Sequence, residues 1–509
     1  MSAILVSRAP SPREGSHPAR TGAPLALVAF LVSVAFSART SLWVDEASTL
    51  KVLRRSWSEM ASMTTEIDLV HAFYYALLHA WVDVVGDSSP AVVRLVSALL
   101  VGATTVVIYA LGRELSSDRL GVAAALVFAV LPTTTEMGMD ARSRALSTLL
   151  VASLVLACTR AFRAGQAGAP DRGQAAARWV TVVALGVLAV LANVYDALAV
   201  AALGVPALVH ARRRRRAAPL VHWGAAAAAT AAVTAPFLLA TAAQSAQVSW
   251  IPPVPLARVP QSFLVSQFFP HAPSLAVVGW GLAGLGVVGL LRDAREGAAP
   301  TVLAWLLVPS GTLLLAGTVA PLWTPRYAVL CTPALALLIG AGLLRLHGAR
   351  RVVVALTLVG LCAVPWAGLR FDSGRTDWVA AGEELRRQRD ELTGSAAVIY
   401  GTQLWEPSTL GVQDPGAVAG LLDLSDRGGA PHGPGWFYGE LRPVEEAAAR
   451  APGVSTVWFV GATGKEQDRA TRALADRGFR PVLEASFPAQ SADRSHRPLS
   501  GTITAYRRI

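Results

Sequence analysis

The sequence has few charged residues and few cysteines, and both shortages exclude classes of protein. Only 16% of its 509 residues are charged, whereas 53% are hydrophobic, which is too apolar for a soluble protein of this length. The three cysteines lie inside apolar runs, so neither a disulfide framework nor a metal–thiolate site is indicated. No long basic stretch carries interleaved aromatic residues, so the net charge of +11 does not indicate nucleic-acid binding. A polytopic membrane protein is expected.

Long apolar runs are abundant in the chain. A membrane span needs about 20 apolar residues, and no convincing cleavage site follows the first run, which is predicted to remain as a span. Residues 179–210 are too long for one span and somewhat short for two, and a hairpin turning at residues 193–196 is predicted. The eleven predicted spans are residues 22–39, 90–112, 119–135, 143–160, 179–194, 196–211, 220–241, 272–291, 300–319, 327–345 and 351–369.

The arginines between these spans fall in alternate connections. Cytoplasmic loops are enriched in Lys and Arg, so this parity predicts a cytoplasmic tail (residues 1–21), a transmembrane domain (residues 22–370) and an extracytoplasmic C-terminal domain (residues 371–509). A single span over residues 179–210 would break the parity, which favours the hairpin. The arginines concerned are Arg113, Arg119, Arg160, Arg163, Arg172, Arg178, Arg212 to Arg216, Arg292, Arg295, Arg345, Arg350 and Arg351.

The first outer loop, residues 40–89, has helical patterns of its own. Residues 70–85 carry one apolar stripe, and an earlier stripe has helical spacing, so both are predicted as helices lying in the membrane interface. The earlier stripe is formed by Leu50, Leu53, Trp57 and Met60. Lys51, Arg54 and Arg55 beside it run against the positive-inside rule unless they meet anionic head groups or a phosphate. A second outer loop, residues 242–271, is interpreted as a flap over a site or as a simple connector.

After Arg370 the composition changes, and no later run is long enough to span a membrane. Helical and strand-like patterns alternate there, which predicts a small α/β domain. It contains no glycine-rich phosphate loop and no convincing nucleophile motif. Helices are predicted at residues 377–391 and 465–476, and strands at residues 396–400, 454–460, 481–487 and 502–506.

Acidic residues and arginines gather at the predicted outer boundary of the membrane. Carboxylates near hydrocarbon are costly unless they face a cavity or a partner, so the shared depth predicts one polar cavity. Each feature also fits a simpler role: a solvated loop start, a hydrated turn, or an arginine anchored at the interface. His71 and His79 lack a third metal ligand, and no metal site is predicted from them. The boundary residues are Asp45, Glu46, Asp68, His71, Glu136, Asp140, Arg142, Asp196, Arg326 and Tyr327.

Five motifs in this order carry a family resemblance. They are Leu42-Trp43-Val44-Asp45-Glu46-Ala47, Asp68 to Tyr75, Arg94 to Ser97, Asp140-Ala141-Arg142 and Pro325-Arg326-Tyr327. With the first span before them, they resemble the bacterial GT-C glycosyltransferases, in the branch of protein O-mannosyltransferases and lipid A aminoarabinose transferases. The chain departs from that family at residues 70–72, where prolines are common, and at Asp140-Ala141-Arg142, where a Glu often precedes the Arg.

The resemblance implies a GT-C fold and an inverting transferase that uses a sugar carried on a polyprenyl phosphate at the outer face of the cytoplasmic membrane. It implies Asp45 as the general base, with Glu46 orienting the acceptor or sharing that task. The donor phosphate is expected to contact Arg326, Tyr327, Arg142 and Arg94, with Arg54 and Arg55 as further candidates. Asp68, His71, Glu136 and Asp140 are expected to bind substrate.

The resemblance implies mannose first, with a pentose such as arabinose as the alternative. The implied acceptor is a protein, a glycolipid or a polysaccharide. No cofactor is assigned, and a divalent metal ion is left open because some relatives use one at the acidic loop. The partners are thus a lipid-linked sugar donor, an acceptor and membrane lipid, without nucleic acid.

Two other functions are weighed against the transferase. A transporter or exporter of a lipid or glycan would need polar residues and broken helices near the middle of the membrane, and commonly two related halves. The middle positions here are Ala, Leu, Val and Gly, and no internal repeat is evident. A membrane-anchored sensor or assembly protein would not need the acids of the first loop.

Overall fold

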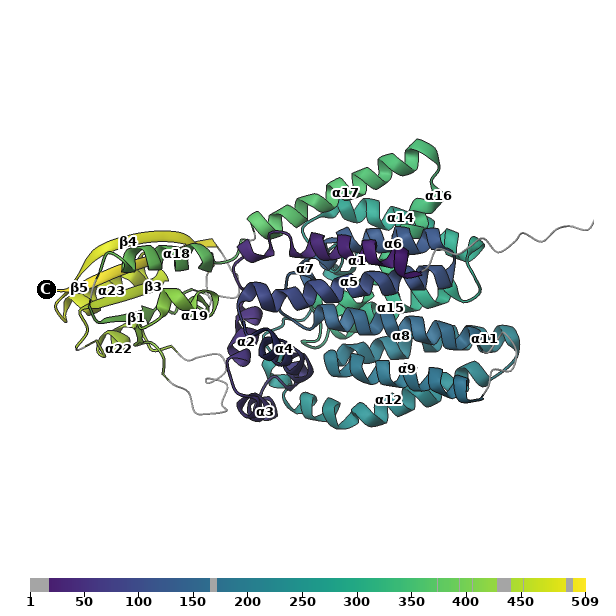
Figure 1. Ribbon diagram of the computed structural model, residues 1–509, viewed down its shortest axis with the longest axis horizontal. Helices are drawn as coiled ribbons and strands as arrows, with labels where there is room; N and C mark the ends of the chain where they lie inside the picture. Colours follow the sequence, from purple (N-terminus) through teal and green to yellow (C-terminus); the bar gives the residue numbers. More distant parts are fainter. Residues whose placement is uncertain are drawn as a thin grey trace, which may run out of the picture.

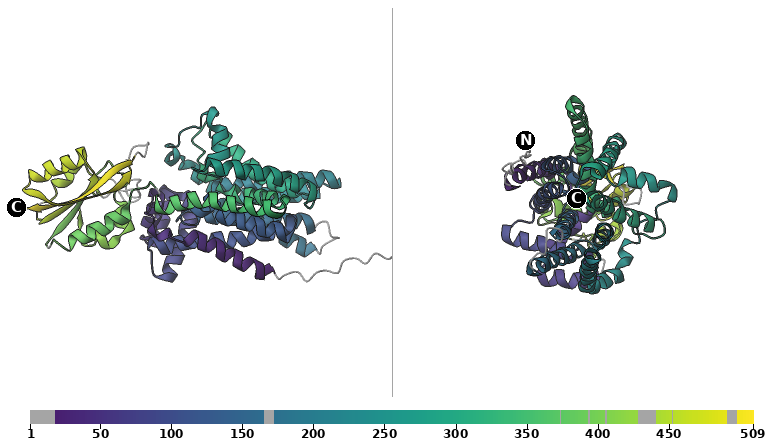
Figure 2. Two further views of the ribbon diagram at one scale, coloured as in Figure 1. Left: turned by 90° about the horizontal axis from the view of Figure 1, so that it is seen from above. Right: turned by 90° about the vertical axis from the view of Figure 1, so that its right-hand side faces the viewer.

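The computed structural model describes residues 18–164, 172–372, 374–392, 394–404, 406–427, 441–451, 453–490 and 498–509. Most of the predicted tail, residues 1–21, lies outside this part of the chain. A long bundle of helices carries a smaller domain with a sheet at one end (Figure 1). The view from above places that domain at the end opposite to the start of the first helix, α1 (Figure 2).

Ten helical segments of the described residues are long and apolar enough to cross a membrane, so the chain is a multi-pass membrane protein. Their helices are α1 (Pro18–Val34), α5 (Pro90–Leu115), α8 (Arg144–Ala164), α9 (Arg172–Ala192), α10 (Ala197–Ala202) with α11 (Gly204–Arg214), α12 (Ala218–Ala243), α14 (Pro273–Asp293), α15 (Ala298–Ala316), η7 (Pro325–Cys331) with α16 (Thr332–Arg345), and α17 (Gly348–Phe371).

The predicted span at residues 119–135 is not one continuous helix, so it is not among the ten long helices of the described residues. It is divided into α6 (Asp118–Val130) and α7 (Pro132–Met137). Leu131 precedes Pro132 and leaves the helical region, with ψ at 140°, because a residue before proline is pushed towards extended conformations. The helices α6 and α7 together still run along the bundle, because α6 packs between the long helices α5 and α16.

The predicted hairpin within residues 179–210 is confirmed. α9 ends at Ala192, and a short 3-10 turn, η3 (Val194–Asp196), leads into α10. The side-chain oxygen of Asn193 accepts a hydrogen bond from the Tyr195 amide at 3.2 Å, which satisfies a backbone donor that the turn would otherwise leave unpaired.

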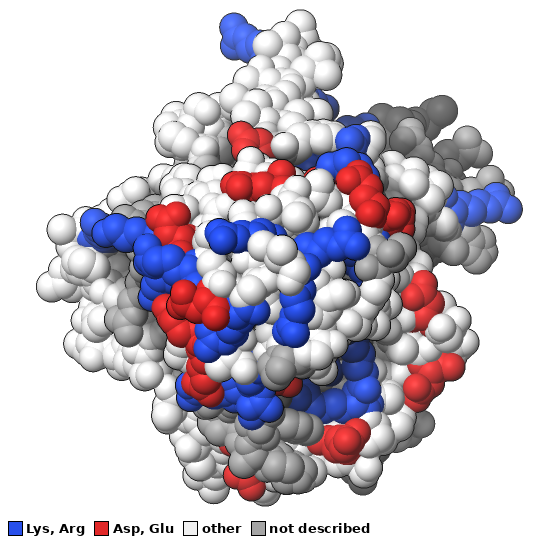
Figure 3. All heavy atoms as spheres, turned by 90° about the vertical axis from the view of Figure 1, so that its left-hand side faces the viewer, with Lys and Arg blue, Asp and Glu red and all other residues white. Residues whose placement is uncertain are grey.

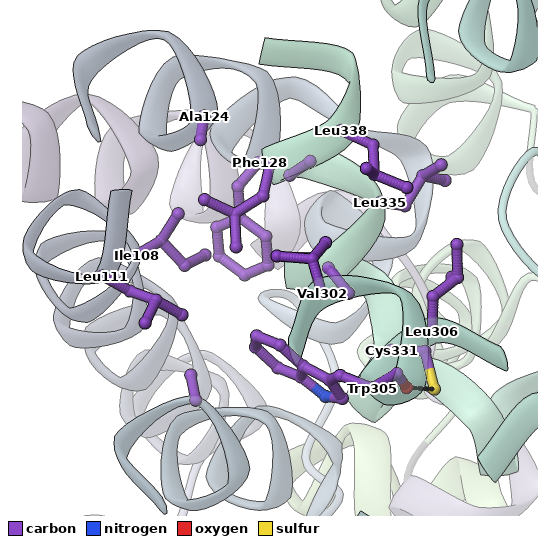
Figure 4. Packing of buried hydrophobic residues seen from close by; sticks show 14 of the residues in the cluster. Ile108, Leu111, Ala124, Phe128, Val302, Trp305, Leu306, Cys331, Leu335 and Leu338 are labelled. Atoms are coloured by element: carbon purple, nitrogen blue, oxygen red, sulfur yellow. Dashed lines mark hydrogen bonds between the residues drawn. The ribbon is translucent and has the colours of Figure 1, made fainter. Parts of the chain in front are cut away.

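The centre of the bundle is an apolar core. Figure 4 shows Phe128 of α6 and Trp305 of α15 near Ile108 and Leu111 of α5, with Leu335 and Leu338 of α16 in the same cluster. α14 and α16 approach most closely at glycines: a Cβ atom on Gly286 would lie 1.9 Å from the Leu338 carbonyl oxygen. Small residues let membrane helices come this close and gain van der Waals contact.

The first outer loop forms three short helices at the end of the bundle next to the sheet domain (Figure 1). They are α2 (Val44–Leu53), α3 (Trp57–Glu66) and α4 (Ala72–Val85). The single predicted stripe from Leu50 to Met60 is therefore divided between two helices. Ser56 ends the continuity because it starts α3 with a capping box, in which its side chain bonds the Glu59 amide and Glu59 bonds its amide in return.

The C-terminal domain is a five-stranded sheet covered by helices. The strands are β1 (Ala396–Tyr400), β2 (Leu422–Asp423), β3 (Thr456–Ala462), β4 (Phe479–Gln490) and β5 (Pro498–Arg508), in the order β2-β1-β3-β5-β4. β1 runs parallel to β2 and β3, whereas β5 is antiparallel to β3 and β4. Its helices are α18 (Trp378–Arg389), α19 (Thr409–Gln413), α20 (Pro415–Val418), α22 (Val444–Ala448) and α23 (Lys465–Ala475).

The predicted helices and strands of this domain are confirmed. Among its described residues, the elements that were not predicted are the short ones, β2, α19, α20 and α22. Two clusters of buried side chains lie on the two faces of the sheet, one around Trp458 and one around Phe459. Acidic and basic side chains are interspersed on the end surface of the molecule (Figure 3). This surface therefore does not present one sign of charge.

The domain docks on α2 through polar contacts. Arg54 donates hydrogen bonds to the carbonyl oxygens of Gly411 and Val412, both at 3.2 Å. Lys51 lies 3.7 Å from Glu406. Two of the cations that ran against the positive-inside rule thus contact the C-terminal domain, where their charges and donors have partners.

Candidate active site

Asp45 and Glu46 are adjacent at the start of α2, yet they face different surroundings. Successive residues of a helix point about 100° apart. Asp45 Oδ2 accepts a hydrogen bond from Arg326 Nη1 at 2.7 Å, and the side chains are 27% and 23% exposed. Glu46 is fully buried. The two carboxylates therefore have separate partners and separate access to a ligand.

Glu46 forms a buried, two-pronged ion pair with Arg94 of α5. The contacts are Nε to Oε1 at 2.7 Å and Nη2 to Oε2 at 2.6 Å. The Ala141 amide also donates to Glu46, and Arg94 donates to the carbonyl oxygens of Ser37 and Thr40. The motifs predicted a catalytic role for Glu46 and a phosphate contact for Arg94, and both roles stay predictions. In this structure the two side chains bind each other and hold the loop before α2.

Arg142 lies behind Asp45 in a second network. Its guanidinium donates to the Asp45 carbonyl oxygen and the Thr49 hydroxyl, both at 3.3 Å, to the Tyr75 hydroxyl at 3.4 Å and to His71 Nε2 at 2.5 Å. Burial lowers the Arg142 pKa by itself, but the surrounding phenol and carboxylates raise it, so the guanidinium stays charged. Its position is thus fixed by four groups of the first outer loop.

His71 and Asp68 complete this network. Asp68 accepts a hydrogen bond from the Tyr75 hydroxyl, and burial raises the pKa of Asp68 against the opposing charge of Arg142. Burial and the Arg142 charge hold the pKa of His71 well below its usual value, so the ring is neutral at pH 7. Because His71 Nε2 accepts from Arg142, the proton lies on Nδ1. That buried nitrogen has no hydrogen-bond partner within the described residues.

Glu136 and Asp140 both pair with Arg144, at the start of α8. Asp140 accepts from Arg144 Nε at 2.9 Å and from Trp43 Nε1 at 2.8 Å, and Glu136 accepts from Arg144 at 3.1 Å. Burial by itself would raise the Asp140 pKa, but Arg144 and the Trp43 donor lower it below its usual value. Asp140 is therefore ionised and positions the Trp43 ring.

Trp43 is the centre on which three arginines converge. The guanidinium carbons of Arg326, Arg375 and Arg144 lie 4.9, 5.7 and 6.0 Å from its ring centroid, within the range of cation–π attraction. Arg375 belongs to the segment between α17 and α18 and also lies 3.8 Å from Glu46. No role was predicted for Trp43 or Arg375 from the sequence. Trp43 stood inside a recognised motif, but Arg375 had no local signal.

The second outer loop borders the same site. Trp250 lies 5.6 Å from Arg326. The ring of Tyr327 packs against Tyr195 with their centroids 4.9 Å apart. Gln244 accepts from the Leu69 amide at 2.9 Å, which ties the loop to the segment before α4. The loop therefore contacts the site through Trp250, and its action as a flap stays a prediction.

The carboxylates do not form a metal site in the described part of the chain, where no three His, Cys, Asp or Glu side chains gather closely enough. Asp45, Glu46 and Asp140 each face a guanidinium. A divalent cation bound to any of these carboxylates would lie close to the positively charged guanidinium and would be repelled by it. The residues present therefore fit an anion better than a metal ion.

The chain is similar to known proteins in part of its sequence and in its fold. A family model described as dolichyl-phosphate-mannose-protein mannosyltransferase matches residues 70–239. No curated protein matches the chain by sequence.

Two solved structures share the arrangement of helices. ArnT from Cupriavidus metallidurans bound to undecaprenyl phosphate has 13% sequence identity and a TM-score of 0.58, and the alignment covers 94% of this chain and 97% of ArnT. Arabinofuranosyltransferase AftD from Mycobacteria has 16% identity and a TM-score of 0.52. That alignment covers 96% of this chain but 40% of AftD, so this chain spans less than half of AftD. The predicted fold is confirmed: the chain is a multi-pass membrane protein with the fold of the GT-C glycosyltransferases.

Proposed function

We propose that the protein is an inverting glycosyltransferase that moves a sugar from a polyprenyl-phosphate donor to an acceptor hydroxyl, with Asp45 as the general base. The observation that carries this proposal is the 2.7 Å contact between Asp45 and Arg326, both partly exposed. A base for the acceptor and a cation for the leaving phosphate thereby share one site. Glu46, Asp68 and Asp140 are buried and less accessible to an acceptor.

The reaction needs both groups. The acceptor oxygen attacks the anomeric carbon while its proton passes to an Asp45 carboxylate oxygen. The bond between that carbon and the phosphate oxygen breaks, and the polyprenyl phosphate leaves with the electron pair. Arg326 offsets the charge on the leaving phosphate with its planar set of donors. One direct displacement inverts the anomeric centre.

The contact between Asp45 and Arg326 is expected to change when the donor binds. A donor phosphate competes with Asp45 for the Arg326 guanidinium, and the Asp45 carboxylate is then free to accept a hydrogen bond from the acceptor hydroxyl. Arg142 and Tyr327 are proposed as further phosphate ligands, because Arg142 holds Asp45 from behind and Tyr327 follows Arg326 in η7.

The remaining predicted contacts are proposed to divide into two groups. Glu136 and Asp140 hold Arg144 and Trp43 in place. Their proposed role is to position these two side chains, which then contact the substrate. His71 is proposed to contact substrate directly, since its Nδ1 proton has no partner in the described chain. Asp68 holds Tyr75 and shapes the same wall.

Mannose is the proposed sugar, because the matched family model is described by dolichyl-phosphate mannose. Arabinose is the second candidate, since AftD, which shares the fold, is an arabinofuranosyltransferase. The site is proposed to lie on the extracytoplasmic side, because the arginine-rich connections lie at the opposite end of the bundle. The C-terminal domain is proposed to position the acceptor, which is a protein, a glycolipid or a polysaccharide.

The test compares Asp45→Asn with wild type in membranes supplied with polyprenyl-phosphate mannose or polyprenyl-phosphate arabinose. Loss of the base is expected to reduce sugar transfer by roughly 10²- to 10⁴-fold. Asp468→Asn, at an exposed position of α23, is the matched control and should retain full transfer. Normal transfer by Asp45→Asn would remove Asp45 as base. Movement of lipid-linked sugar across the membrane without transfer by wild type would favour a transporter.

A further inference from the structure

A hollow lies between α6, α16 and α17, towards the end of the bundle opposite to Asp45 and Arg326. Its volume is about 700 Å³, within the range of small-molecule sites. α17 diverges from the other helices towards this end (Figure 1), and only 11% of its span is buried inside the protein. The hollow is therefore open along the side of the bundle that faces membrane lipid.

The walls of this hollow are apolar and run along the helices. Val122, Leu126 and Val130 line it at intervals of one turn on α6, and Leu358 and Val359 line it on α17. From residue 119 to residue 130 the groove follows α6 for roughly 16 Å at 1.5 Å per residue. An extended hydrocarbon chain fits such a groove better than a compact polar ligand.

The mouth of the groove is cationic. Arg119 at the start of α6 and Arg351 at the start of α17 both line it. Asp118 lies there too, but it accepts from Arg113 at 2.5 Å and from the Tyr109 hydroxyl at 3.3 Å. Arg351 donates from Nε to the carbonyl oxygen of Leu346, just after α16, and from Nη2 to that of Leu344, in the last turn of α16. Those carbonyls carry no net charge, so the mouth keeps an excess of positive charge.

We infer that this groove binds an anionic glycerophospholipid of the membrane, with one acyl chain along α6 and α17 and the head-group phosphate between Arg119 and Arg351. The match is one of charge and shape: cations at one end, hydrocarbon walls along the length, and an opening towards the lipid. A smaller hollow of about 450 Å³, lined by Arg345, His347 and Arg350, adjoins at the turn between α16 and α17. It extends the basic surface available to a second head-group charge.

The lipid would act by filling the space behind a poorly packed helix, which stabilises the position of α17. This site is separate from the donor site, because Asp45 and Arg326 lie at the other end of the bundle. The inference is also independent of the proposed transferase activity. It concerns the binding of a bulk membrane lipid.

Native mass spectrometry of the purified full-length protein tests the inference directly. Wild type in detergent is titrated with phosphatidylglycerol or with phosphatidylcholine of the same acyl chains. A preference of roughly five-fold or more for phosphatidylglycerol is expected, since one basic side chain near an anionic lipid supplies about this factor. Arg119→Gln should lose most of this preference. Ala355→Trp, which places a large ring in the groove, should lose the bound lipid of both kinds.

Arg213→Gln is the matched control, because Arg213 is an exposed cation at the C-terminal end of α11 and does not line the hollow. It should bind lipid as wild type does. The inference would be overturned if wild type retained the two lipids equally. It would also be overturned if Arg213→Gln lost the phosphatidylglycerol preference as far as Arg119→Gln does, or if Ala355→Trp bound lipid as wild type does. Ala355 lies on the loosely packed α17, and Arg119 is exposed, so both variants are expected to fold. A thermal midpoint that phosphatidylglycerol raises in wild type but not in Arg119→Gln supplies a second readout.

Discussion

The two ends of the helix bundle use arginine in opposite ways. At the site end Arg94, Arg142 and Arg144 are enclosed and held by several acceptors each. At the other end Arg119 and Arg213 are exposed. Holding an arginine in a buried network fixes its direction before a ligand arrives, whereas an exposed arginine contributes charge without a fixed geometry. The arginines of the site end therefore have fixed positions, which the proposed binding of one donor phosphate requires, whereas those of the other end can follow the membrane surface.

The largest expected effect is a difference in the free energy of unfolding when one ion pair at each end of the bundle is broken. Arg94→Met leaves the Glu46 carboxylate buried without its partner, which is expected to cost about 3–5 kcal/mol of unfolding free energy. Arg113→Met removes the partly exposed pair with Asp118 and is expected to cost about 1 kcal/mol or less. Thermal unfolding of both variants in the same detergent measures the difference. Equal losses of unfolding free energy in the two variants would mean that the Glu46–Arg94 pair is no better enclosed than the Arg113–Asp118 pair.

The next effect separates geometry from charge at the site. Arg326→Lys keeps the positive charge but loses the planar fork of donors, so kcat/KM for the lipid-linked donor is expected to fall roughly 100-fold. The unfolding midpoint should change little, because Arg326 is partly exposed. Arg258→Lys, at an exposed position of the second outer loop, is the control and should keep wild-type kinetics. Unchanged kinetics in Arg326→Lys would show that charge alone suffices.

A smaller effect follows from the neutral His71 ring. Its pKa lies well below 6.5 in the folded protein, so below pH 6.5 the unfolded chain binds a proton that the folded chain does not. The contribution of the His71 ring to the free energy of unfolding is fully present above pH 6.5. It falls as the pH drops towards the folded pKa, by at most roughly 1.4 kcal/mol per pH unit. The unfolding midpoint of wild type should thus fall more between pH 7 and pH 5 than that of His71→Asn.

The control for this pH dependence is His271→Asn. His271 is exposed and has a φ of 58°, which asparagine tolerates. This variant should follow the wild-type pH profile. An identical profile in His71→Asn would show that the network around Arg142 does not keep the His71 ring neutral.

The smallest expected effect is at the exposed arginines of the other end. Arg212→Gln should leave sugar transfer unchanged and the unfolding free energy within about 0.5 kcal/mol of wild type, as is usual for surface replacements. Both are measured in the same preparations as the site variants. A loss of transfer comparable to that of Arg326→Lys would remove the functional distinction between the two ends.

Much of the fold could be predicted because the signals are local. The hairpin at residues 193–196 followed from the length of the apolar run and the arginines that flank it. The division of the span at residues 119–135 also had a visible signal, since Pro132 stands inside it, but the run was long and apolar enough to be taken as continuous. Within the described residues of the C-terminal domain, the strands and helices that were not predicted have five residues or fewer, too few for a periodic pattern.

The candidate site was predictable as a set but not as a geometry. Asp45, Arg142 and Arg326 were named from motifs, and the structure brings them together around the start of α2. Arg375 and the pairing of Glu46 with Arg94 were not predicted, because each depends on residues that are far apart in the sequence. Glu46 and Asp45 carry the same chemistry and differ only in the direction in which the helix points them.

The sequence by itself determined the environment of the chain: the lengths of its apolar runs, the alternate placing of its arginines, and the change to a polar domain after Arg370. These are local properties, since the hydrophobic effect and the cost of placing charge in lipid act on each segment separately. Only the tertiary structure decided which carboxylate stays open and which is buried. That choice depends on Arg94, Arg326 and Trp43 meeting α2 from three separate segments, which no local pattern encodes.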